Sequence, residues 1–387
     1  MEHEVSVITG IQATLALDKS SYLPVPVYIS KEGDWYTGEH LLRIESYRDL
    51  DEAVGRARLI RPVPDSGGGL DLTAASRKIF GNNVIDHVDV LLVAMHGSEG
   101  ENGALQGTLE MLNVAYTGSD VTASAIGMDK SMSKMITRAA GVPSLDQVVI
   151  TDAGWIGNED DWMNRCENNL GFPVIVKPMR LGSSIGIGVA EDRVQLESIL
   201  EDTFRLDFRA LVEPCVVNLR EFNCSVLSRV TGPEASVVEE PVRLTGSDLL
   251  SFEQKYQRDT GKGPTKASRL DAGMASLDRI IPADVPGGRE NYLRELAVKV
   301  FEAVGCSGVA RIDFLYDADE DAFYFNEINT IPGSFSFYLW EASGIPFERL
   351  LEELLDGAVR EHWSRNAKIR SYETNLLSDN AFSGVKT

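Results

Sequence analysis

Residues 325–333 read FNEINTIPG, and residues 309–314, a little upstream, read VARIDF. Each stretch is largely apolar but carries two polar side chains at alternating positions: Arg311 and Asp313 in one, Glu327 and Asn329 in the other. Because strand side chains alternate between faces, the two members of each pair share a face. Residues 316–322, YDADEDA, are a polar turn signal that typically joins antiparallel strands. Pairing of the strands would gather three oxygen ligands and one guanidinium on one surface; the alternative is an ordinary solvated sheet face with a surface salt bridge.

Composition argues against several classes of protein. The 387 residues are enough for two or three domains. A net charge of -22 repels nucleic acid and anionic membranes, so we expect neither as a partner, and the sequence has no apolar run long enough to span a bilayer. The 4 cysteines form no CxxC pair and the 5 histidines lack metal-ligand spacing, which argues against zinc. Sparse cysteine and a first segment unlike a signal peptide favour the cytoplasm.

Periodicity along the chain predicts mixed helices and strands. A helix is expected over residues 5–17 with Ile8, Ile11 and Leu15 on one face, and the apolar run 88–95 is typical of a central parallel strand. Further strands are expected at 25–30, 172–179, 184–190, 210–217, 222–228 and 235–241, and further helices at 128–141, 289–304 and 346–361. The helix over 289–304 has the clearest apolar face, made of Leu293, Leu296, Ala297, Val300, Phe301 and Val304, and ends at Gly305.

These elements divide the chain into an α/β unit over residues 1–122, a small unit over 123–216, a third unit over 217–363 and a polar tail over 364–387. The polar segment 245–274 has no clear periodicity, which is typical of a functional lid or a disordered loop.

The stretch KPMRLGSSIGIG, residues 177–188, combines a lysine, a Gly-Ser-Ser turn and a second strand. Glycine lets a phosphate approach the backbone, and the hydroxyl and N–H groups of Ser183 and Ser184 could cradle its oxygens. A simple glycine-rich hairpin is an equal alternative. Lys177 favours the phosphate site, because a lysine in an apolar strand needs an anionic partner or an exposed end.

Three further charged residues are more ambiguous. Lys130 belongs to a helix that also carries Lys134 and Arg138, and most such lysines are simply solvated. Glu213 and Glu221 could accept hydrogen bonds from a ribose or a purine amino group, or they could be ordinary surface acids.

Asp313, Glu327 and Asn329 supply the oxygen ligands that Mg²⁺ prefers, and Arg311 could stabilise charge on a transferred group. Together these residues favour nucleotide-dependent chemistry.

The chain resembles the D-alanine–D-alanine ligase family of the ATP-grasp superfamily. The resemblance covers nearly the whole chain, in order, through these segments: EHEVS (2–6), HGSEGENGALQG (96–107), YTGSD (116–120), MDK (128–130), VIVKPMRLGSS (174–184), EQKY (253–256), RIDF (311–314) and NEINTIPG (326–333). It implies a three-domain ATP-grasp fold, in which a Rossmann-like α/β N-terminal domain precedes two α+β lobes that hold ATP between them.

The resemblance also implies a role for each matching residue. Lys130 and Lys177 resemble the lysines that contact the nucleotide phosphates, and Glu213 and Glu221 the acids on the adenine and ribose sides. Asp313, Glu327 and Asn329 match the ligands of Mg²⁺ or Mn²⁺. Glu2, Ser183 and Tyr256 match a hydrogen-bonded trio near the first substrate's amine. His96 resembles the histidine near the reacting carboxylate, and Lys255 a lid lysine that faces the γ-phosphate. Arg311 and the N–H group of Gly333 match the oxyanion site.

The implied reaction joins two molecules of D-alanine through an acyl phosphate, for peptidoglycan precursor synthesis, and a homodimer is implied as well. A lid over 245–274 would protect the acyl phosphate from water. A sister ligase that uses D-lactate, D-serine or another amino acid as second substrate is one alternative, and a nucleotide-binding protein without ligase activity is another. Tyr256 favours D-alanine as the acceptor.

Three features depart from the family pattern. The strand and Gly-Gly turn that normally precede EHEVS are missing, so we expect the first domain to lack its first strand. Asn102 stands where aspartate is common. Tyr338 and Leu339 stand where relatives often have a Ser-Leu pair that holds the second substrate's carboxylate. A tyrosine hydroxyl can still donate a hydrogen bond, but the pocket must differ in size.

Overall fold

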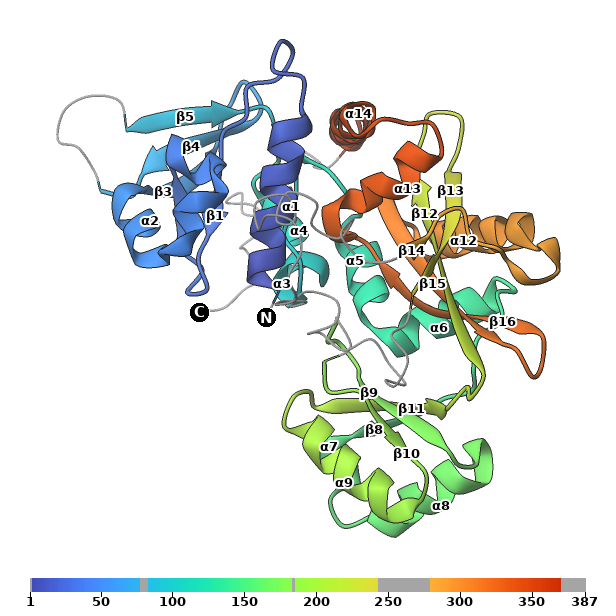
Figure 1. Ribbon diagram of the computed structural model, residues 1–387. Coiled ribbons are helices and arrows are strands. Elements are labelled where there is room, and N and C mark those ends of the chain that lie inside the picture. The colour runs from blue at the N-terminus through green and yellow to red at the C-terminus, as the bar shows by residue number, and fades with distance from the viewer. Residues whose placement is uncertain (1, 77–82, 183–184, 243–278, 370–387) are drawn as a thin grey trace, which may run out of the picture.

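The computed structural model describes residues 2–76, 83–182, 185–242 and 279–369. Figure 1 shows an N-terminal region, a small central lobe and a C-terminal lobe arranged around a common centre. Within the described ranges, no helix combines the length and the apolar character that are needed to cross a membrane.

The N-terminal region contains two sheets. Strands β1 to β5 form an antiparallel sheet in chain order, and β6 pairs with β7 in parallel. The strands are β1 Tyr28–Ile29, β2 Trp35–Thr37, β3 Arg58–Pro64, β4 Leu70–Ala74, β5 Val84–Val88, β6 Val90–Leu91 and β7 Ala115–Tyr116. The helices are α1 His3–Ala16, η1 Glu39–Leu42, η2 Ile44–Arg48, α2 Leu50–Arg56, α3 Ser98–Glu101, α4 Ala104–Met111 and α5 Val121–Met128. The apolar run 88–95 thus contributes a parallel strand, but β6 has only two residues and belongs to a two-stranded sheet, so the expectation of a central strand is wrong.

Helix α1 buries a different face from the one that the sequence predicted. Its buried residues are Val5, Thr9, Gln12 and Ala13. Leu15, which we expected on the buried face, is 61% exposed. The reason is that Thr9 and Gln12 make polar contacts with the segment around Ser334, which turns this side of α1 inward.

The central lobe is one antiparallel sheet in the order β10-β9-β11-β8, with helices on the face turned away from the other two regions (Figure 1). Its strands are β8 Val148–Thr151, β9 Val174–Pro178, β10 Gly188–Ala190 and β11 Arg209–Pro214. Its helices are α7 Asp152–Trp155, α8 Glu159–Leu170 and α9 Arg193–Phe204. Helix α6, Lys130–Ala139, precedes the lobe and ends before Gly141 as predicted, with Gly141 at φ +82°.

The C-terminal lobe is built on a second antiparallel sheet in the order β14-β13-β12-β15-β16. Its strands are β12 Leu219–Leu227, β13 Glu234–Pro241, β14 Arg279–Ile280, β15 Val309–Asp317 and β16 Ala322–Asn329. Its helices are η4 Pro286–Gly288, α12 Glu290–Val304, η5 Gly333–Ser336, α13 Phe337–Ala342 and α14 Phe347–Asn366. Helix α14 extends to Asn366, so the first residues of the expected polar tail are helical.

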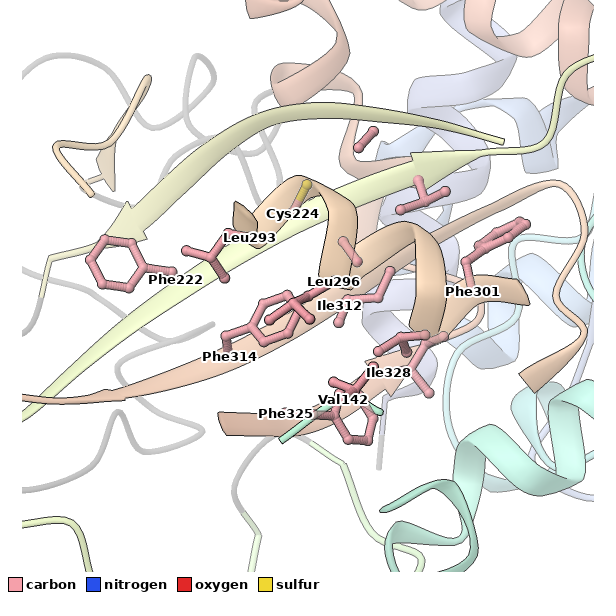
Figure 2. Close-up of a cluster of buried hydrophobic side chains, with 14 of the residues drawn as sticks. Val142, Phe222, Cys224, Leu293, Leu296, Phe301, Ile312, Phe314, Phe325 and Ile328 are labelled. Atoms are coloured by element: carbon pink, nitrogen blue, oxygen red, sulfur yellow. The ribbon is translucent and has the colours of Figure 1, made fainter. Parts of the chain in front are cut away.

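Helix α12 confirms the strongest helix prediction. All six expected residues are buried, and Gly305 ends the helix in the left-handed conformation. Figure 2 shows Leu293 and Leu296 of α12 packed against Phe222, Ile312 and Phe314 of the sheet. Because these sheet residues face α12, the alternate residues of the same strands point to the opposite face, toward the centre of the molecule.

The pairing of β15 and β16 also confirms that the polar side chains of residues 309–314 and 325–333 lie on one surface. Asp313 lies opposite Glu327, and Arg311 lies opposite Asn329. The same rung continues across two more strands, because Asp313 pairs with Asn223 and Asn223 pairs with Glu239. One polar row, made of Glu239, Asn223, Asp313 and Glu327, therefore crosses four strands on the face opposite α12.

Candidate active site

A cavity of about 420 Å³ lies where the three regions meet, over this polar row. It gathers residues that are far apart in sequence. The lining includes these predicted site residues: Glu2, His96, Lys130, Lys177, Glu221, Arg311, Asp313, Glu327, Asn329 and Gly333. The structure therefore brings most of the predicted site residues that it describes into one cavity.

Arg311 and Asp313 form a closely paired unit in this cavity. Two guanidinium nitrogens, Nε and Nη2, each donate to a different oxygen of Asp313 over 2.7 Å, and the side chains are only 12% and 13% exposed. Burial acts to lower the pKa of Arg311, but the neighbouring Asp313 carboxylate outweighs it and keeps that pKa well above its ordinary value. Arg311 is thus a permanent positive charge aimed along the cavity wall.

Asp313, Glu327 and Asn329 fit a divalent cation by the chemistry of their donors. Two carboxylates and one amide share a face, and the amide nitrogen of Asn329 donates to Asp313 over 3.1 Å. Lys130 Nζ lies 3.9 Å from Glu327, so a cation and a phosphate could be held side by side. Oxygen ligands of this kind suit Mg²⁺ or Mn²⁺.

Lys177 and Glu213 belong to a buried ion network that differs from the expected one. Lys177 Nζ donates to Glu213 over 2.8 Å and to Asn326 over 2.9 Å, while Lys134 lies 2.5 Å from the other oxygen of Glu213. Burial acts to raise the pKa of Glu213, but the two lysines outweigh it and lower that pKa to about 2. The side chain of Glu213 is 0% exposed.

The carboxylate of Glu213 is enclosed between the two lysines, and its contact with the adenine side of a nucleotide stays a prediction from the family resemblance. Among the described residues around the cavity, Glu213 contributes no surface, whereas Glu221 does. Glu213 holds Lys177 in place, on the wall that carries Lys130. Lys130 itself donates to the carbonyl of Leu181 over 2.6 Å, and burial lowers its pKa against the opposing effect of Glu327.

His96 is fixed by two partners. Its Nε2 lies 2.8 Å from the hydroxyl of Thr9, and its ring also hydrogen-bonds to the backbone of Ile331. Burial lowers the pKa of His96 to about 4, so the ring is neutral near pH 7. The histidine is thus a neutral hydrogen-bonding group that contacts Ile331, two residues before Gly333.

Glu101 closes the same part of the cavity. Its carboxylate accepts a hydrogen bond from the N–H group of Gly97 over 2.8 Å and another from the backbone of Ile331. Burial, helped by the charge of Glu2, raises the pKa of Glu101 to about 8. Ile331 is thus held by His96 and by Glu101, both from the N-terminal region.

Glu2 lies between two glycines. A Cβ atom on Gly97 would lie 2.9 Å from one carboxylate oxygen of Glu2, and a Cβ on Gly182 would lie 2.9 Å from the other. Gly97 also has φ +89°, which side chains disfavour. Gly97 needs glycine because of its backbone conformation, and at both positions a side chain would displace the Glu2 carboxylate from the cavity wall.

Comparisons with known proteins agree with this arrangement. A family model described as "D-ala D-ala ligase N-terminus" matches residues 1–119, and one described as "D-ala D-ala ligase C-terminus" matches residues 136–356. The chain belongs to the D-Ala–D-Ala ligase family. The D-alanine–D-alanine ligase of Thermosipho melanesiensis is 33% identical, with 97% of this chain and 95% of the relative covered. That of Geobacillus kaustophilus is 34% identical, with coverage of 93% and 92%.

Solved structures of this ligase family share the fold. The D-alanine–D-alanine ligase from Coxiella burnetii has a TM-score of 0.73 and 27% identity, with 95% of this chain and 92% of that chain covered. The VanG D-Ala:D-Ser ligase from Enterococcus faecalis also has a TM-score of 0.73, with 26% identity and coverage of 92% and 96%. The mixed α/β architecture is accordingly that of an ATP-grasp ligase.

Some predicted ligase residues lie outside the described part of the chain. They are Ser183, Ser184, Lys255 and Tyr256, together with the expected lid over 245–274. Their roles stay predictions from the family resemblance.

Tyr338, which the resemblance places at the pocket for the second substrate, is held by two buried charged residues. The hydroxyl of Tyr338 accepts a hydrogen bond from Arg279 over 2.7 Å and donates to Glu239 over 3.3 Å. Burial raises the pKa of Tyr338 to about 12. Among the described residues around the cavity, Arg279 is present, whereas Tyr338 and Leu339 are not. Arg279 and Glu239 engage the Tyr338 hydroxyl, and a role of Tyr338 and Leu339 at the second substrate stays a prediction from the family resemblance.

Sequence reasoning missed Lys134, Glu101, Thr9 and Arg279. Lys134 carried a signal, because it lies four residues from Lys130 and shares its helix face. Glu101 lies within the HGSEGENG segment that carries the resemblance. Nothing local distinguished Thr9 or Arg279, whose importance comes from residues that are distant in sequence.

Proposed function

We propose that this chain is an ATP-dependent D-alanine–D-alanine ligase that supplies the dipeptide for peptidoglycan precursors. The observation that carries the proposal is one cavity that is lined both by lysines and by carboxylates. The lysines are Lys130 and Lys177. The carboxylates are Asp313 and Glu327, and Arg311 lines the cavity beside them. The relatives named above are themselves called D-alanine–D-alanine ligases, at 33–34% identity over nearly the full chain.

The first step needs charge neutralisation more than covalent help from the protein. The γ-phosphoryl group of ATP passes to the carboxylate of the first D-alanine, which gives an acyl phosphate and ADP. Lys130 and Lys177 would balance the phosphate charge, with Lys177 held by Glu213 and Asn326. Glu2, which lines the same cavity, would pair with the ammonium group of the first D-alanine.

In the second step the neutral amine of another D-alanine attacks the acyl carbon, and phosphate leaves. Negative charge develops on the carbonyl oxygen during this attack. Arg311 and the N–H group of Gly333 would stabilise it. His96 and Glu101 hold the adjoining Ile331 and so keep this N–H group in position.

Asp313, Glu327 and Asn329 would hold Mg²⁺ or Mn²⁺, which when bound neutralises phosphate charge. We propose a reducing, cytoplasmic location, which is supported by four free cysteines. A homodimer stays a prediction from the family.

A second candidate is a ligase that transfers the first D-alanine to a different acceptor. The structural likeness to a D-Ala:D-Ser ligase favours it, as does the altered surrounding of Tyr338. D-Serine, D-lactate and other amino acids are the acceptors to compare. A nucleotide-binding protein without ligase activity is the remaining alternative.

Release of inorganic phosphate from ATP separates these functions. The purified chain is incubated with D-alanine alone and with D-alanine plus D-serine, D-lactate or L-alanine, and the products are identified by mass spectrometry. We expect ATP-dependent D-alanyl-D-alanine from D-alanine alone. A mixed product formed in clear preference would support the second candidate, and nucleotide binding without phosphate release would refute both ligase functions.

A further inference from the structure

Arg279, at the start of β14, is a charged residue of the cavity wall that the reaction described above does not use. Its Nη1 donates to Glu239 over 2.5 Å and to the Tyr338 hydroxyl over 2.7 Å. Its guanidinium carbon lies 4.1 Å from the centroid of the Tyr338 ring. The side chain is 5% exposed and yet lines the cavity. Arg279 is thus a firmly positioned cation.

Glu239 is the buried partner that holds Arg279 in position. Its side chain is 0% exposed, and its other oxygen accepts from Asn223 over 2.9 Å and from Tyr338 over 3.3 Å. A buried ion pair adds little net stability compared with apolar residues of the same size. A pair of this kind, with its cation at a cavity wall, is better explained by the need for a positive charge there than by folding.

Arg279 also lies at a useful place relative to the reaction. The sheet order is β14-β13-β12-β15-β16, so Glu327 and Lys130 lie near one end of the polar row and Arg279 near the other. Arg311 lies between them and hydrogen-bonds to Tyr338. An amino acid whose amine attacks near Arg311 could therefore direct its carboxylate toward Arg279, away from the phosphates.

We propose that Arg279 binds the α-carboxylate of the second amino acid and that Tyr338 holds its guanidinium in place. This inference rests on the proposed ligase function and deepens it. Arginine pairs with carboxylates through two parallel N–H groups, which fixes orientation as well as charge. Tyr338 then serves as a positioning residue under Arg279, and the acceptor must carry a free carboxylate.

The test compares acceptors with and without that carboxylate. Hydroxylamine traps the acyl phosphate as D-alanine hydroxamate and phosphate, so it reports the first step alone. D-Alaninamide keeps the attacking amine but lacks the carboxylate, and in mixtures with D-alanine the ratio of the two dipeptide products reports acceptor choice. Both are measured for the wild type and for Arg279→Met, Arg279→Lys and Tyr338→Phe.

We expect the wild type to prefer D-alanine over D-alaninamide by about tenfold to a hundredfold, as a charged hydrogen bond implies. Arg279→Met should abolish this preference, whereas hydroxamate should still form. Arg279→Lys should retain part of the preference, and Tyr338→Phe should weaken it.

Arg220→Met is the matched control. Arg220 makes two hydrogen bonds to Glu240, of 2.8 and 2.7 Å, on the neighbouring strand pair, and it is not among the described residues that line the cavity. Its removal should leave the acceptor preference intact. If Arg279→Met does not fold, the double variant Arg279→Met/Glu239→Gln removes both buried charges together and takes its place.

An unchanged product ratio in a folded, active Arg279 variant would overturn the proposal while the ligase function stands. A wild type without preference for D-alanine over its amide would overturn it equally. A wild type that forms neither dipeptide nor hydroxamate would refute the proposed function, and this inference with it.

Discussion

The hydroxyl of Thr9 accepts a hydrogen bond from the backbone N–H group of Ser334 over 3.2 Å, although the two residues lie 325 positions apart. The same hydroxyl lies 2.8 Å from His96, and Gln12 accepts from the Ser334 hydroxyl over 2.7 Å. The buried polar face of α1 therefore hydrogen-bonds to the segment that follows Gly333. This contact explains why the first helix of the chain bears on a site built largely from the last sheet.

Replacement of Thr9 by valine keeps the shape and removes the hydroxyl. The buried N–H group of Ser334 then loses its partner, so the free energy of unfolding should fall by about 1–3 kcal/mol. The turnover number should also fall, because Gly333 precedes Ser334. Thr14→Val is the control, since its hydroxyl donates to the carbonyl of Gly10 within the same helix. Urea unfolding and steady-state rates of both variants check this, and equal effects would contradict it.

Three successive non-glycine residues, Ser334, Phe335 and Ser336, have φ values of 52°, 53° and 52°. Each left-handed residue costs roughly 1–2 kcal/mol. The Ser336 hydroxyl is buried and has no hydrogen-bond partner in the described structure. Ser336→Gly should therefore raise the free energy of unfolding by about 1 kcal/mol, after allowance for the flexibility of glycine.

Ser334→Gly relieves the same kind of strain but loses the hydrogen bond to Gln12. Its gain in stability should be smaller than that of Ser336→Gly or reversed. Thermal unfolding of both variants measures the difference. A Ser336→Gly protein that is less stable than the wild type would show that the segment is not strained.

Local patterns predicted the sheet face and the main core helix, because alternation and helical periodicity are properties of neighbouring residues. Alternation alone put the two polar pairs of these strands on one surface if the strands paired, and the structure pairs them, with Asp313 opposite Glu327. Leu15 was predicted to be buried but is exposed, and the ion pair of Glu213 with Lys134 was not predicted. The surroundings of these residues are set by Ser334 and by Lys134, whose proximity depends on how the three regions pack.

Glu101 should make stability depend on pH. Its pKa is raised to about 8 in the folded protein by burial and by Glu2, above the ordinary carboxyl value of 4.5. Between these two pH values the folded state binds more protons than the unfolded state, so stability should fall as pH rises, by up to about 1.4 kcal/mol per unit. Glu101→Gln keeps an acceptor for Gly97 but cannot titrate.

The difference in unfolding free energy between wild type and Glu101→Gln should favour the wild type most below pH 4.5. It should shrink toward pH 8 and then stay level. Urea titrations at one-unit intervals follow this difference. A difference that is constant from pH 5 to 8 would show that Glu101 does not titrate in this range.

Glu327→Gln tests the proposed metal site. The amide has the shape of the carboxylate but lacks its charge, so Mn²⁺ should bind more weakly and turnover should fall by orders of magnitude, with the fold intact. Mn²⁺ affinity is measured by electron paramagnetic resonance in the presence of nucleotide. Glu320→Gln is the control, since Glu320 is in the exposed turn between β15 and β16. Unaltered Mn²⁺ affinity in Glu327→Gln would remove Glu327 from the site.

Glu213→Gln tests whether Glu213 contacts the nucleotide itself or acts by holding Lys134 and Lys177 in position. The substitution leaves Lys134 and Lys177 buried without their shared counter-charge, so the free energy of unfolding should fall by about 3–5 kcal/mol. The pKa of Glu213 is lowered to about 2, against 4.5 for an ordinary glutamate. The stability that its charge contributes is therefore fully present above pH 4.5 and lost as pH falls through about 2. The pKa of Lys134, about 8 in the wild type with Glu213 raising it, should fall further in the variant, so the deficit of the variant should grow as pH falls from 8 toward 5.

Lys134→Met combined with Glu213→Gln removes one buried cation together with the anion and should recover much of the lost stability. If Glu213 acts only through Lys177, ATP affinity should stay weak in this double variant, because Lys177 still lacks its carboxylate partner. The affinity for adenosine, which has no phosphates, should match that of the wild type in both variants. Calorimetric titration with ATP and with adenosine distinguishes the two roles, and a loss of adenosine binding would support the direct contact with the adenine side.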